Sequence, residues 1–214
     1  MFSERKSFRR EAPEDRKEAL IRATLRILAE AGPGGATVRA IADAAGMTQG
    51  MIRHYFSSKE ELISAAFETH MRDMTEASGA SLETGQDSAV VRLAYFVTGG
   101  LTPPVVDPAA VSIWAGFLHA VRKDPDMRET HKRGYYFFRD RLEALIADAL
   151  SEAGRAGEPT RALAIACNAV LDGLWLEGGA LPDAFADGEL PAIGLRSVGA
   201  ILGLDLGEFE RDRQ

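Results

Sequence analysis

Several features that define whole classes of protein are missing from this chain of 214 residues. Its one cysteine, Cys167, excludes an internal disulfide and a cysteine-rich zinc site, and it fits a reducing compartment. No apolar run approaches the roughly 20 residues that a transmembrane helix needs. The opening residues, Met-Phe-Ser-Glu-Arg-Lys, are followed by no apolar segment, so we expect no secretory signal. These absences favour a cytoplasmic protein that does not bind membranes.

The motifs that carry most enzyme chemistry are missing as well. The sequence has no glycine-rich phosphate loop, no His-Glu-x-x-His zinc motif and no nucleophile elbow. Its histidines are scattered along the chain, at His54, His70, His119 and His131. An isolated histidine is more often a surface or core residue than a ligand. We therefore predict that the chain is not an enzyme and holds neither a metal nor a cofactor.

Charge is distributed unevenly along the chain, whose net charge is −7 at pH 7. Residues 1–63 carry 11 Lys and Arg against 9 Asp and Glu, whereas the remainder carries 14 against 23. A DNA-binding protein contacts phosphates only where its surface meets the duplex, so only that surface must be positively charged. The acidic total therefore does not exclude a nucleic-acid partner for the N-terminal part.

Residues 37–56 predict two short helices joined by a tight turn. Thr37 is a suitable N-cap for the first helix, and Thr48 for the second. The apolar faces consist of Val38, Ile41, Ala42 and Ala45 in the first helix and Ile52, Tyr55 and Phe56 in the second. Gly46 ends the first helix, because glycine accepts the left-handed conformation that a helix stop needs. This is the layout of a DNA-binding helix-turn-helix, although a helical hairpin that merely packs shares it.

The residues that follow make the DNA-binding interpretation specific. Ser58 and Glu61 form a capping box directly after the second helix. An amphipathic first helix, the Thr37 start, the Ala-Gly turn and the run Tyr55-Phe56-Ser57-Ser58-Lys59-Glu60-Glu61-Leu62 make residues 16–63 resemble the N-terminal domain of TetR-family transcriptional repressors. The resemblance implies an arm and helix-turn-helix DNA-binding domain over residues 1–63. It also implies an effector-binding and dimerisation domain over residues 64–214.

The predicted DNA contacts lie on the recognition helix and at the ends of its neighbours. They are Thr37, Arg39, Thr48, Gln49, Gly50, Arg53, His54, Tyr55 and Lys59. On the outer face of the recognition helix, Gln49 can pair with adenine and Arg53 with guanine. Thr37, Tyr55 and Lys59 resemble the positions at which the family contacts phosphates. The ring of Tyr55 suits core packing too, which is compatible with an outward hydroxyl.

Helical spacing continues through the rest of the chain, and no stretch alternates as a strand would. We predict an all-α fold with about nine helices. Their approximate ranges are 13–31, 38–45, 49–56, 58–78, 88–97, 108–124, 127–153, 159–178 and 190–204. Gly99-Gly100 and Pro103-Pro104 are expected to stop the fifth helix. Before the first helix, Arg5, Lys6, Arg9 and Arg10 suit either an unstructured terminus or an arm that reaches the DNA.

A polar and aromatic stripe marks the eighth predicted helix. Asn168, Asp172 and Trp175 recur at i, i+4 and i+7 beside an apolar stripe. A carboxylate among apolar residues is costly unless something pairs with it. The partner is either an arginine (Arg92, Arg139 or Arg141) or a cationic ligand held by aromatic rings. The rings that we expect around such a ligand, which ordinary core packing would also explain, are Tyr95, Phe96, Trp114, Phe117, Tyr135 and Tyr136.

The run Leu171-Asp172-Gly173-Leu174-Trp175-Leu176 resembles the same region of BetI-type TetR members, which repress genes that convert choline to glycine betaine. The resemblance covers residues 14–63 and 160–180 well and the middle poorly. It implies choline or another cationic amine as effector. The ligand-binding residues that we predict are Tyr95, Phe96, Trp114, Phe117, Asn168, Asp172 and Trp175. A TetR-type regulator of efflux genes that responds to bulky lipophilic compounds is the alternative.

The last two predicted helices carry more apolar residues than one domain core should use. The stripe consists of Leu163, Cys167, Val170, Leu171, Leu174, Val198, Ile201 and Leu202. We predict that these helices pair with those of a second copy in a four-helix bundle. The homodimer would then bind a pseudo-palindromic operator in double-stranded DNA.

Overall fold

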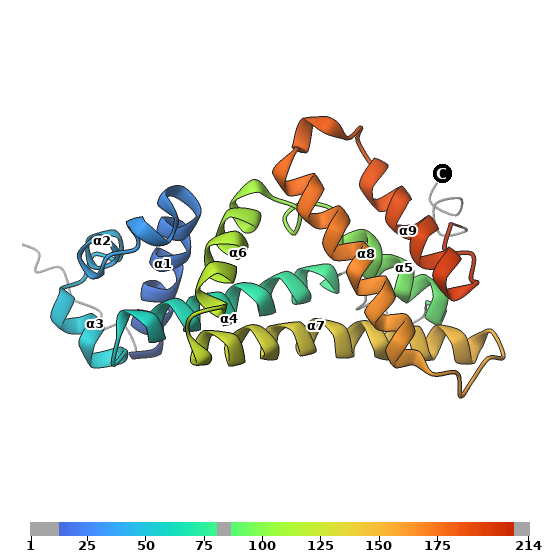
Figure 1. Cartoon of the computed structure of the whole chain (residues 1–214), viewed down its shortest axis with the longest axis horizontal. Coiled ribbons are helices and arrows are strands. Elements are labelled where there is room, and N and C mark those ends of the chain that lie inside the picture. The colour runs from blue at the N-terminus through green and yellow to red at the C-terminus, as the bar shows by residue number, and fades with distance from the viewer. Residues whose placement is uncertain (1–12, 81–86, 208–214) are drawn as a thin grey trace, which may run out of the picture. The chain divides into compact units, whose positions relative to one another are not determined.

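The computed structural model describes residues 13–80 and 87–207, and the chain is all-α within these ranges, where no strand is assigned (Figure 1). The helices are α1 (Pro13–Gly35), α2 (Val38–Ala44), α3 (Gln49–Tyr55), α4 (Lys59–Ser78), α5 (Ala89–Gly100), α6 (Pro108–Val121), α7 (Pro125–Glu152), α8 (Thr160–Ala180), the short 3-10 helix η2 (Pro182–Ala184) and α9 (Glu189–Leu202). The predicted all-α fold is thereby confirmed. The four basic residues predicted as an arm lie outside the described residues. None of the described helices is long and apolar enough to cross a membrane.

The first compact unit, Met1–Ala66, contains α1, α2, α3 and the start of α4. Apolar side chains from each of these segments form its core: Leu20, Leu28, Ile41, Ile52, Phe56, Leu62 and Ala66. The ammonium of Lys17 lies 5.7 Å from the centre of the Phe56 ring, so α1 also contacts the end of α3 at the edge of this core. Gly32 has φ 64 and interrupts α1 where the sequence predicted the end of the helix. These contacts hold the two short helices of the motif against α1.

The second compact unit, Phe67–Gln214, contains the remainder of α4 and the helices α5 to α9. α5 is its central helix, since it lies against α7, α8 and α9. A single core cluster joins these helices and includes Leu93, Phe96, Leu142, Ile146 and Val198. α7 and α8 are joined by a short connection and contact each other, and α8 crosses α7 at a steep angle (Figure 1).

The fifth helix includes both glycines that were expected to stop it and ends at the second. Gly100 is the last helical residue of α5, and the backbone of Leu101 leaves the helical conformation. A Cβ atom at Gly99 would overlap with the carbonyl oxygen of Ser78. The missing side chain therefore lets α5 pack directly on the end of α4, and close approach explains this glycine better than helix termination.

Aspartate caps fix the starts of α6 and α7. Asp107 Oδ1 accepts a hydrogen bond from the backbone N–H of Ala109 at 2.7 Å, and proline occupies the first turn of the helix as predicted. Asp124 Oδ1 accepts one from the N–H of Asp126 at 2.9 Å. Both helices thus begin at defined residues, which sets the register of the side chains that they carry into the second unit.

Candidate functional site

The helix-turn-helix is held by the caps that its sequence predicted. Thr37 Oγ1 accepts a hydrogen bond from the N–H of Ala40 at 3.1 Å, and Thr48 Oγ1 accepts one from the N–H of Met51 at 3.3 Å. Gly46 has φ 64 in the turn between the helices, a conformation that other residues rarely adopt. The orientation of α3 relative to α2 is therefore set by local hydrogen bonds and by one glycine.

Arg26 holds the same motif, and the sequence analysis missed it. Its Nη2 donates a 2.8 Å hydrogen bond to the carbonyl oxygen of Ala44, the last residue of α2. The last carbonyls of a helix lack partners within the helix and carry partial negative charge, so a guanidinium stabilises them. The contact joins residues 18 positions apart. No spacing rule within one helix could have indicated it.

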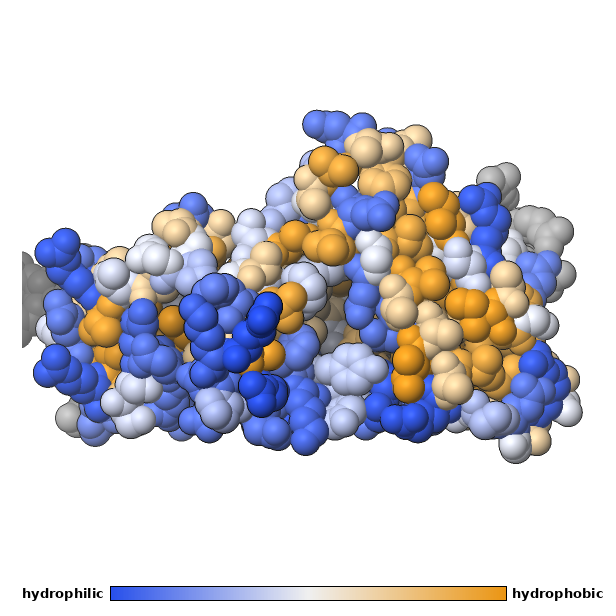
Figure 2. All heavy atoms as spheres, viewed as in Figure 1, coloured by the Kyte–Doolittle hydropathy of each residue, from blue (hydrophilic) through white to orange (hydrophobic). Residues whose placement is uncertain are grey.

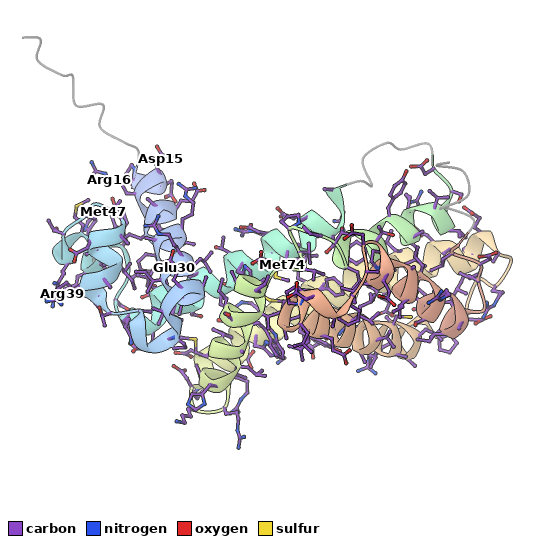
Figure 3. The ribbon with its side chains drawn as sticks, turned by 90° about the horizontal axis from the view of Figure 1, so that it is seen from above. Asp15, Arg16, Glu30, Arg39, Met47 and Met74 are labelled. Carbon is purple, nitrogen blue, oxygen red and sulfur yellow. The ribbon has the colours of Figure 1, made fainter. Side chains whose placement is uncertain are left out.

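The predicted DNA contacts lie at the surface of the first unit. The exposed ones are Thr37, Arg39, Thr48, Gln49, Gly50, Arg53 and His54. Arg39 projects from the outer edge of α2 (Figure 3). Tyr55 and Lys59 are partly buried, and the Tyr55 ring meets the His54 ring edge-on with the centroids 5.1 Å apart. The exposed side chains are thus available to a duplex, and partial burial of Tyr55 agrees with a ring that also packs.

The capping box after the recognition helix differs in one bond from the expected pattern. Ser58 Oγ accepts a hydrogen bond from the N–H of Glu61 at 3.0 Å, as a cap should. Glu61 Oε2, however, accepts bonds from the hydroxyl and the N–H of Ser57, at 2.5 and 2.7 Å, so it reaches one residue further back than a standard box. These bonds from Ser57 lower the pKa of the Glu61 carboxyl.

A cavity of about 280 Å³ lies among the helices of the second unit. Its walls come from α4, α6, α7 and α8, with contributions from the end of α5 and the segment after it. The lining residues are Met71, Met74, Thr75, Ser78, Gly100, Val105, Trp114, His131, Tyr135, Phe138, Asn168, Leu171, Asp172 and Trp175. Small-molecule sites span roughly 300–1,000 Å³, so this volume suits a compact ligand.

The predicted stripe on α8 faces this cavity. Asn168, Asp172 and Trp175 all line it, and Asn168 Nδ2 donates a 2.7 Å hydrogen bond to Asp172 Oδ2. Solvent reaches Asp172 from the open side of the cavity, although protein atoms surround its carboxylate on the other sides. This partial desolvation raises the pKa of Asp172 to about 6, and the bond from Asn168 opposes the rise. A carboxylate at the cavity wall is therefore only weakly stabilised by the protein itself.

Two indole rings form an ordered aromatic wall beside this carboxylate. Trp175 Nε1 donates a 2.8 Å hydrogen bond to the carbonyl oxygen of Val105. The rings of Trp114 and Trp175 meet edge to face, with centroids 5.8 Å apart and planes at 80°. The indole bond and the ring contact fix the orientation of Trp175, so part of its surface is presented to the cavity without reorganisation.

Four of the expected aromatic residues do not line the cavity: Tyr95, Phe96, Phe117 and Tyr136. Phe96 is fully buried in the core cluster, and Tyr95 packs against that cluster. Phe117 is buried against Phe67, and Tyr136 is 40% exposed at the surface. The structure therefore does not bring Tyr95, Phe96 and Phe117 to the cavity that Asp172 lines. Helical spacing shows that an aromatic residue faces inward, but not whether it meets the core or a cavity.

The arginines considered as partners of Asp172 are engaged elsewhere. Arg92 pairs with Asp148 at 3.0 Å, and Arg139 pairs with Asp140 at 2.6 Å. The guanidinium of Arg141 lies beside Gly79 at the end of α4. Among the ion pairs of the described residues, none includes Asp172. The carboxylate is thus not part of an internal salt bridge that serves the fold alone.

His131 is a cavity residue that the sequence analysis treated as an isolated histidine. It lines the cavity from α7, one helical turn before Tyr135. Its Nδ1 is buried and has no hydrogen-bond partner among the described residues. Burial lowers the pKa of its imidazole below the usual value, which favours the neutral ring. The pattern that could have found it is the spacing of His131, Tyr135 and Phe138 at i, i+4 and i+7.

Small and apolar residues make up most of the exposed face of α8, whereas the exposed residues of α9 are Glu189, Arg196 and Ala200. Figure 2 shows hydrophobic side chains gathered over these two helices. The exposed positions of α8 are Arg161, Ala162, Ala166, Ala169, Asp172, Gly173, Leu176, Glu177 and Ala180, and Leu181 beyond the helix is 62% exposed. Four of the residues predicted to pair with a second copy are instead buried in the core of this unit: Cys167, Leu171, Val198 and Leu202. The exposed residues of α8 therefore differ from those of the predicted stripe, of which Leu163, Val170 and Leu174 are partly buried.

A helix-turn-helix unit followed by a helical unit with a small cavity defines a class, the helix-turn-helix transcriptional regulators. Comparisons with known proteins identify the family. Residues 20–66 match the family described as bacterial regulatory proteins, tetR family, and residues 89–203 match the one described as BetI-type transcriptional repressor, C-terminal. The chain therefore belongs to the TetR family of transcriptional regulators and has a C-terminal domain of the BetI type. Members of the family bind operator DNA and small-molecule effectors.

Individual relatives agree with this assignment. The HTH-type transcriptional regulator BetI of Burkholderia thailandensis is 31% identical over 165 residues, which cover 77% of this chain and 82% of that protein. A proposed transcriptional regulator from Pseudomonas aeruginosa PAO1 has a similar structure, with a TM-score of 0.79, 31% identity and coverage of 96% and 98% of the two chains. A third structure, a proposed regulator from Saccharomonospora viridis in complex with choline, gives a TM-score of 0.65 at 19% identity and covers 92% and 96%. These relatives are regulators and not enzymes, as predicted for this chain.

Proposed function

We propose that this regulator binds a small organic cation in the cavity of its second unit, with choline as the first compound to test. The observation that carries the proposal is the meeting of Asp172 with Trp114 and Trp175 in one cavity wall. Aromatic faces attract quaternary ammonium ions, and each such contact contributes roughly 0.5–2 kcal/mol. A carboxylate without a basic partner supplies the countercharge.

The volume of the cavity and the composition of its lining favour a small organic cation over a bulky lipophilic effector. The cavity volume of about 280 Å³ is small for a regulator that would accept large, varied drugs. Its lining residues include no lysine or arginine, so a ligand with net negative charge would meet only Asp172. The choline bound to the regulator from Saccharomonospora viridis shows that a related fold accommodates this molecule. Together these points support a compact cation.

We also propose a homodimer formed through the exposed faces of α8 and α9. The exposed face of α8 consists mainly of alanine and glycine, so two such helices can approach closely. Pairing would also remove the apolar surface around this face from contact with water, which stabilises the dimer. A two-fold dimer places two recognition helices on one duplex. They must lie roughly 34 Å apart to enter successive major grooves. The operator of such a dimer is pseudo-palindromic, because each half-site meets the same protein surface.

The helix α4 is the element through which the cavity would act on DNA binding. It begins at Lys59 in the first unit, and its later residues Met71, Met74, Thr75 and Ser78 line the cavity. If α4 can occupy two positions, a ligand that binds the cavity more tightly in one of them shifts the equilibrium toward that position. Binding would then change operator affinity in proportion to the difference in ligand affinity between the two states.

The test measures DNA binding and ligand binding on the same protein. Purified protein is titrated into labelled DNA from upstream of its own gene, with and without choline at about 10 mM. Choline is also titrated into the protein by calorimetry. Saturable choline binding together with a change in operator affinity supports the proposal. Operator binding without any response to choline or to other trimethylammonium compounds would restrict the function to DNA binding and remove the cationic effector.

A further inference from the structure

We propose that His131 binds the oxygen function of the effector, so that the cavity selects an amino alcohol over the corresponding betaine acid. This inference rests on the proposed function, because it concerns the second polar contact of the same ligand. It assigns a specificity role to a residue that neither the stripe on α8 nor the position of the indole rings indicates.

The first step is that His131 lacks a partner. Its Nδ1 is buried without a hydrogen bond among the described residues, and the ring is part of the cavity wall. Leaving a buried polar atom unpaired costs roughly 1–3 kcal/mol, so such atoms in folded proteins usually meet a ligand or an ordered water. His70 has an unpaired nitrogen as well, but it does not line the cavity. His131 is therefore the cavity-lining histidine with an unpaired nitrogen, and a half-turn of its ring would bring this nitrogen, now closed to solvent, to a ligand in the cavity.

The second step is the placement of the polar groups around the cavity. Asp172 and its neighbour Asn168 come from α8, whereas His131 comes from α7. The Asn168 amide already donates to Asp172, so part of its hydrogen-bonding capacity is used. A ligand with an ammonium group at Asp172 and the indole rings can direct a short polar arm to the imidazole. This arrangement matches a molecule that has one cationic end and one oxygen.

The third step separates a hydroxyl from a carboxylate. A neutral imidazole can accept a hydrogen bond from a hydroxyl or donate one to it. A ligand carboxylate would add a second negative charge beside Asp172, and no lysine or arginine among the lining residues would balance it. Burial lowers the pKa of the His131 imidazole, so the ring does not supply that positive charge near pH 7.5. The hydroxyl compound is the better match.

The experiment compares three trimethylammonium compounds by calorimetry at pH 7.5. Choline carries a hydroxyl, n-propyltrimethylammonium replaces this hydroxyl with a methyl group, and glycine betaine replaces the alcohol with a carboxylate. One net hydrogen bond should make choline bind roughly 3- to 10-fold tighter than the propyl analogue. Glycine betaine should bind more weakly than choline by at least the same factor. The ratio in the wild-type protein already tests the proposal without any variant.

Variants then assign the preference to one side chain. His131→Phe should bring the ratio of choline to propyl affinity close to one while the propyl compound still binds. His131→Asn, which keeps a polar group near the position of Nδ1, should restore part of the preference. His119→Phe changes an exposed histidine outside the cavity and should leave the ratio as in the wild type. A change in the imidazole nitrogen chemical shifts of His131 on addition of choline, absent with the propyl compound, gives a second measurement.

The outcomes distinguish this inference from the proposed function. If wild type binds choline and the propyl compound equally, the role of His131 is wrong and the cation site stands. A preference for choline that persists in a folded His131→Phe protein would move the contact to another residue and overturn the assignment. If no trimethylammonium compound binds at millimolar concentration, both the cation site and the role of His131 are wrong.

Discussion

Asn168 and Asp172 lie one turn apart on α8, and the amide of the first donates a 2.7 Å hydrogen bond to the carboxylate of the second. Asn168 is itself buried, so the bond holds Asp172 against the cavity wall. Burial raises the pKa of Asp172 to about 6, and the amide limits the rise. The pair therefore presents a carboxylate that is ionised at neutral pH but that still gains from a positive partner.

Replacing Asp172 with Asn should remove most of the affinity for a cation. The substitution keeps the shape of the side chain and removes its charge. Contacts to charged groups contribute roughly 1.5–3 kcal/mol, so choline affinity should fall about 10-fold or more, as measured by calorimetry. Asp140→Asn, at an exposed carboxylate outside the cavity, serves as the control. Equal affinity in wild type and Asp172→Asn would place the cation elsewhere.

Affinity for the cation should fall as the solution is acidified through pH 6. The pKa of Asp172 is raised from 3.8 to about 6 by burial, so the folded protein takes up a proton in this range and loses the countercharge. Protonation of His131, whose pKa is lowered by burial, would add positive charge to the cavity and act in the same direction. Calorimetry at pH 7.5 and pH 5 should show the loss in wild type and a smaller one in Asp172→Asn.

The same pKa fixes the sign of a stability effect in the free protein. The folded state holds the Asp172 proton more tightly than the unfolded state between the unfolded value of 3.8 and about 6. The contribution of this residue to stability is therefore greatest below pH 3.8 and is lost as pH rises through 6. A ligand cation reverses the preference, since it stabilises the ionised form.

Trp175→Phe tests the bond that orients the indole. The change keeps an aromatic ring and removes the 2.8 Å hydrogen bond from Nε1 to the Val105 carbonyl, which is left buried. The free energy of unfolding should fall by about 1–3 kcal/mol in a urea titration. Trp114→Phe removes a similar volume from the other ring of the pair and leaves this bond in place. A larger loss at Trp114 than at Trp175 would contradict the role given to the bond.

Much of the fold could be predicted because helices and their caps are local features. The threonine caps, the glycine turn and the i, i+4, i+7 stripe on α8 each depend on residues within one or two turns. The close packing at Gly99 depends on α4, and the contact of Arg26 depends on a partner in another helix, so neither could be predicted. Phe96 and Trp114 look alike in sequence, yet one is core and the other lines the cavity. That distinction depends on where helices diverge, which no local pattern encodes.

Arg53 and Lys59 should differ in how they contribute to DNA binding. Arg53 is exposed on α3, where it can reach a base, so Arg53→Ala should cost roughly 1–3 kcal/mol on the operator and much less on random DNA. Lys59 starts α4 and suits a phosphate, so Lys59→Ala should weaken both DNAs and reduce the salt slope by about one. Anisotropy titrations at several salt concentrations measure both quantities. Equal losses on both DNAs for Arg53→Ala would make it a phosphate contact.

The dimer can be tested at Ala169, which is exposed in the middle of the apolar face of α8. Ala169→Glu places a charge where two copies of the helix would meet, and the two-fold axis introduces it twice. Burial of an unpaired carboxylate costs several kcal/mol, so the dissociation constant of the dimer should rise by at least about 100-fold in sedimentation experiments. Operator affinity should fall with it, because the two half-sites are then bound independently. Ala147→Glu, at an exposed position on α7, is the matched control and should leave both properties unchanged. If Ala169→Glu sediments as a dimer like the control, the interface does not include this face of α8.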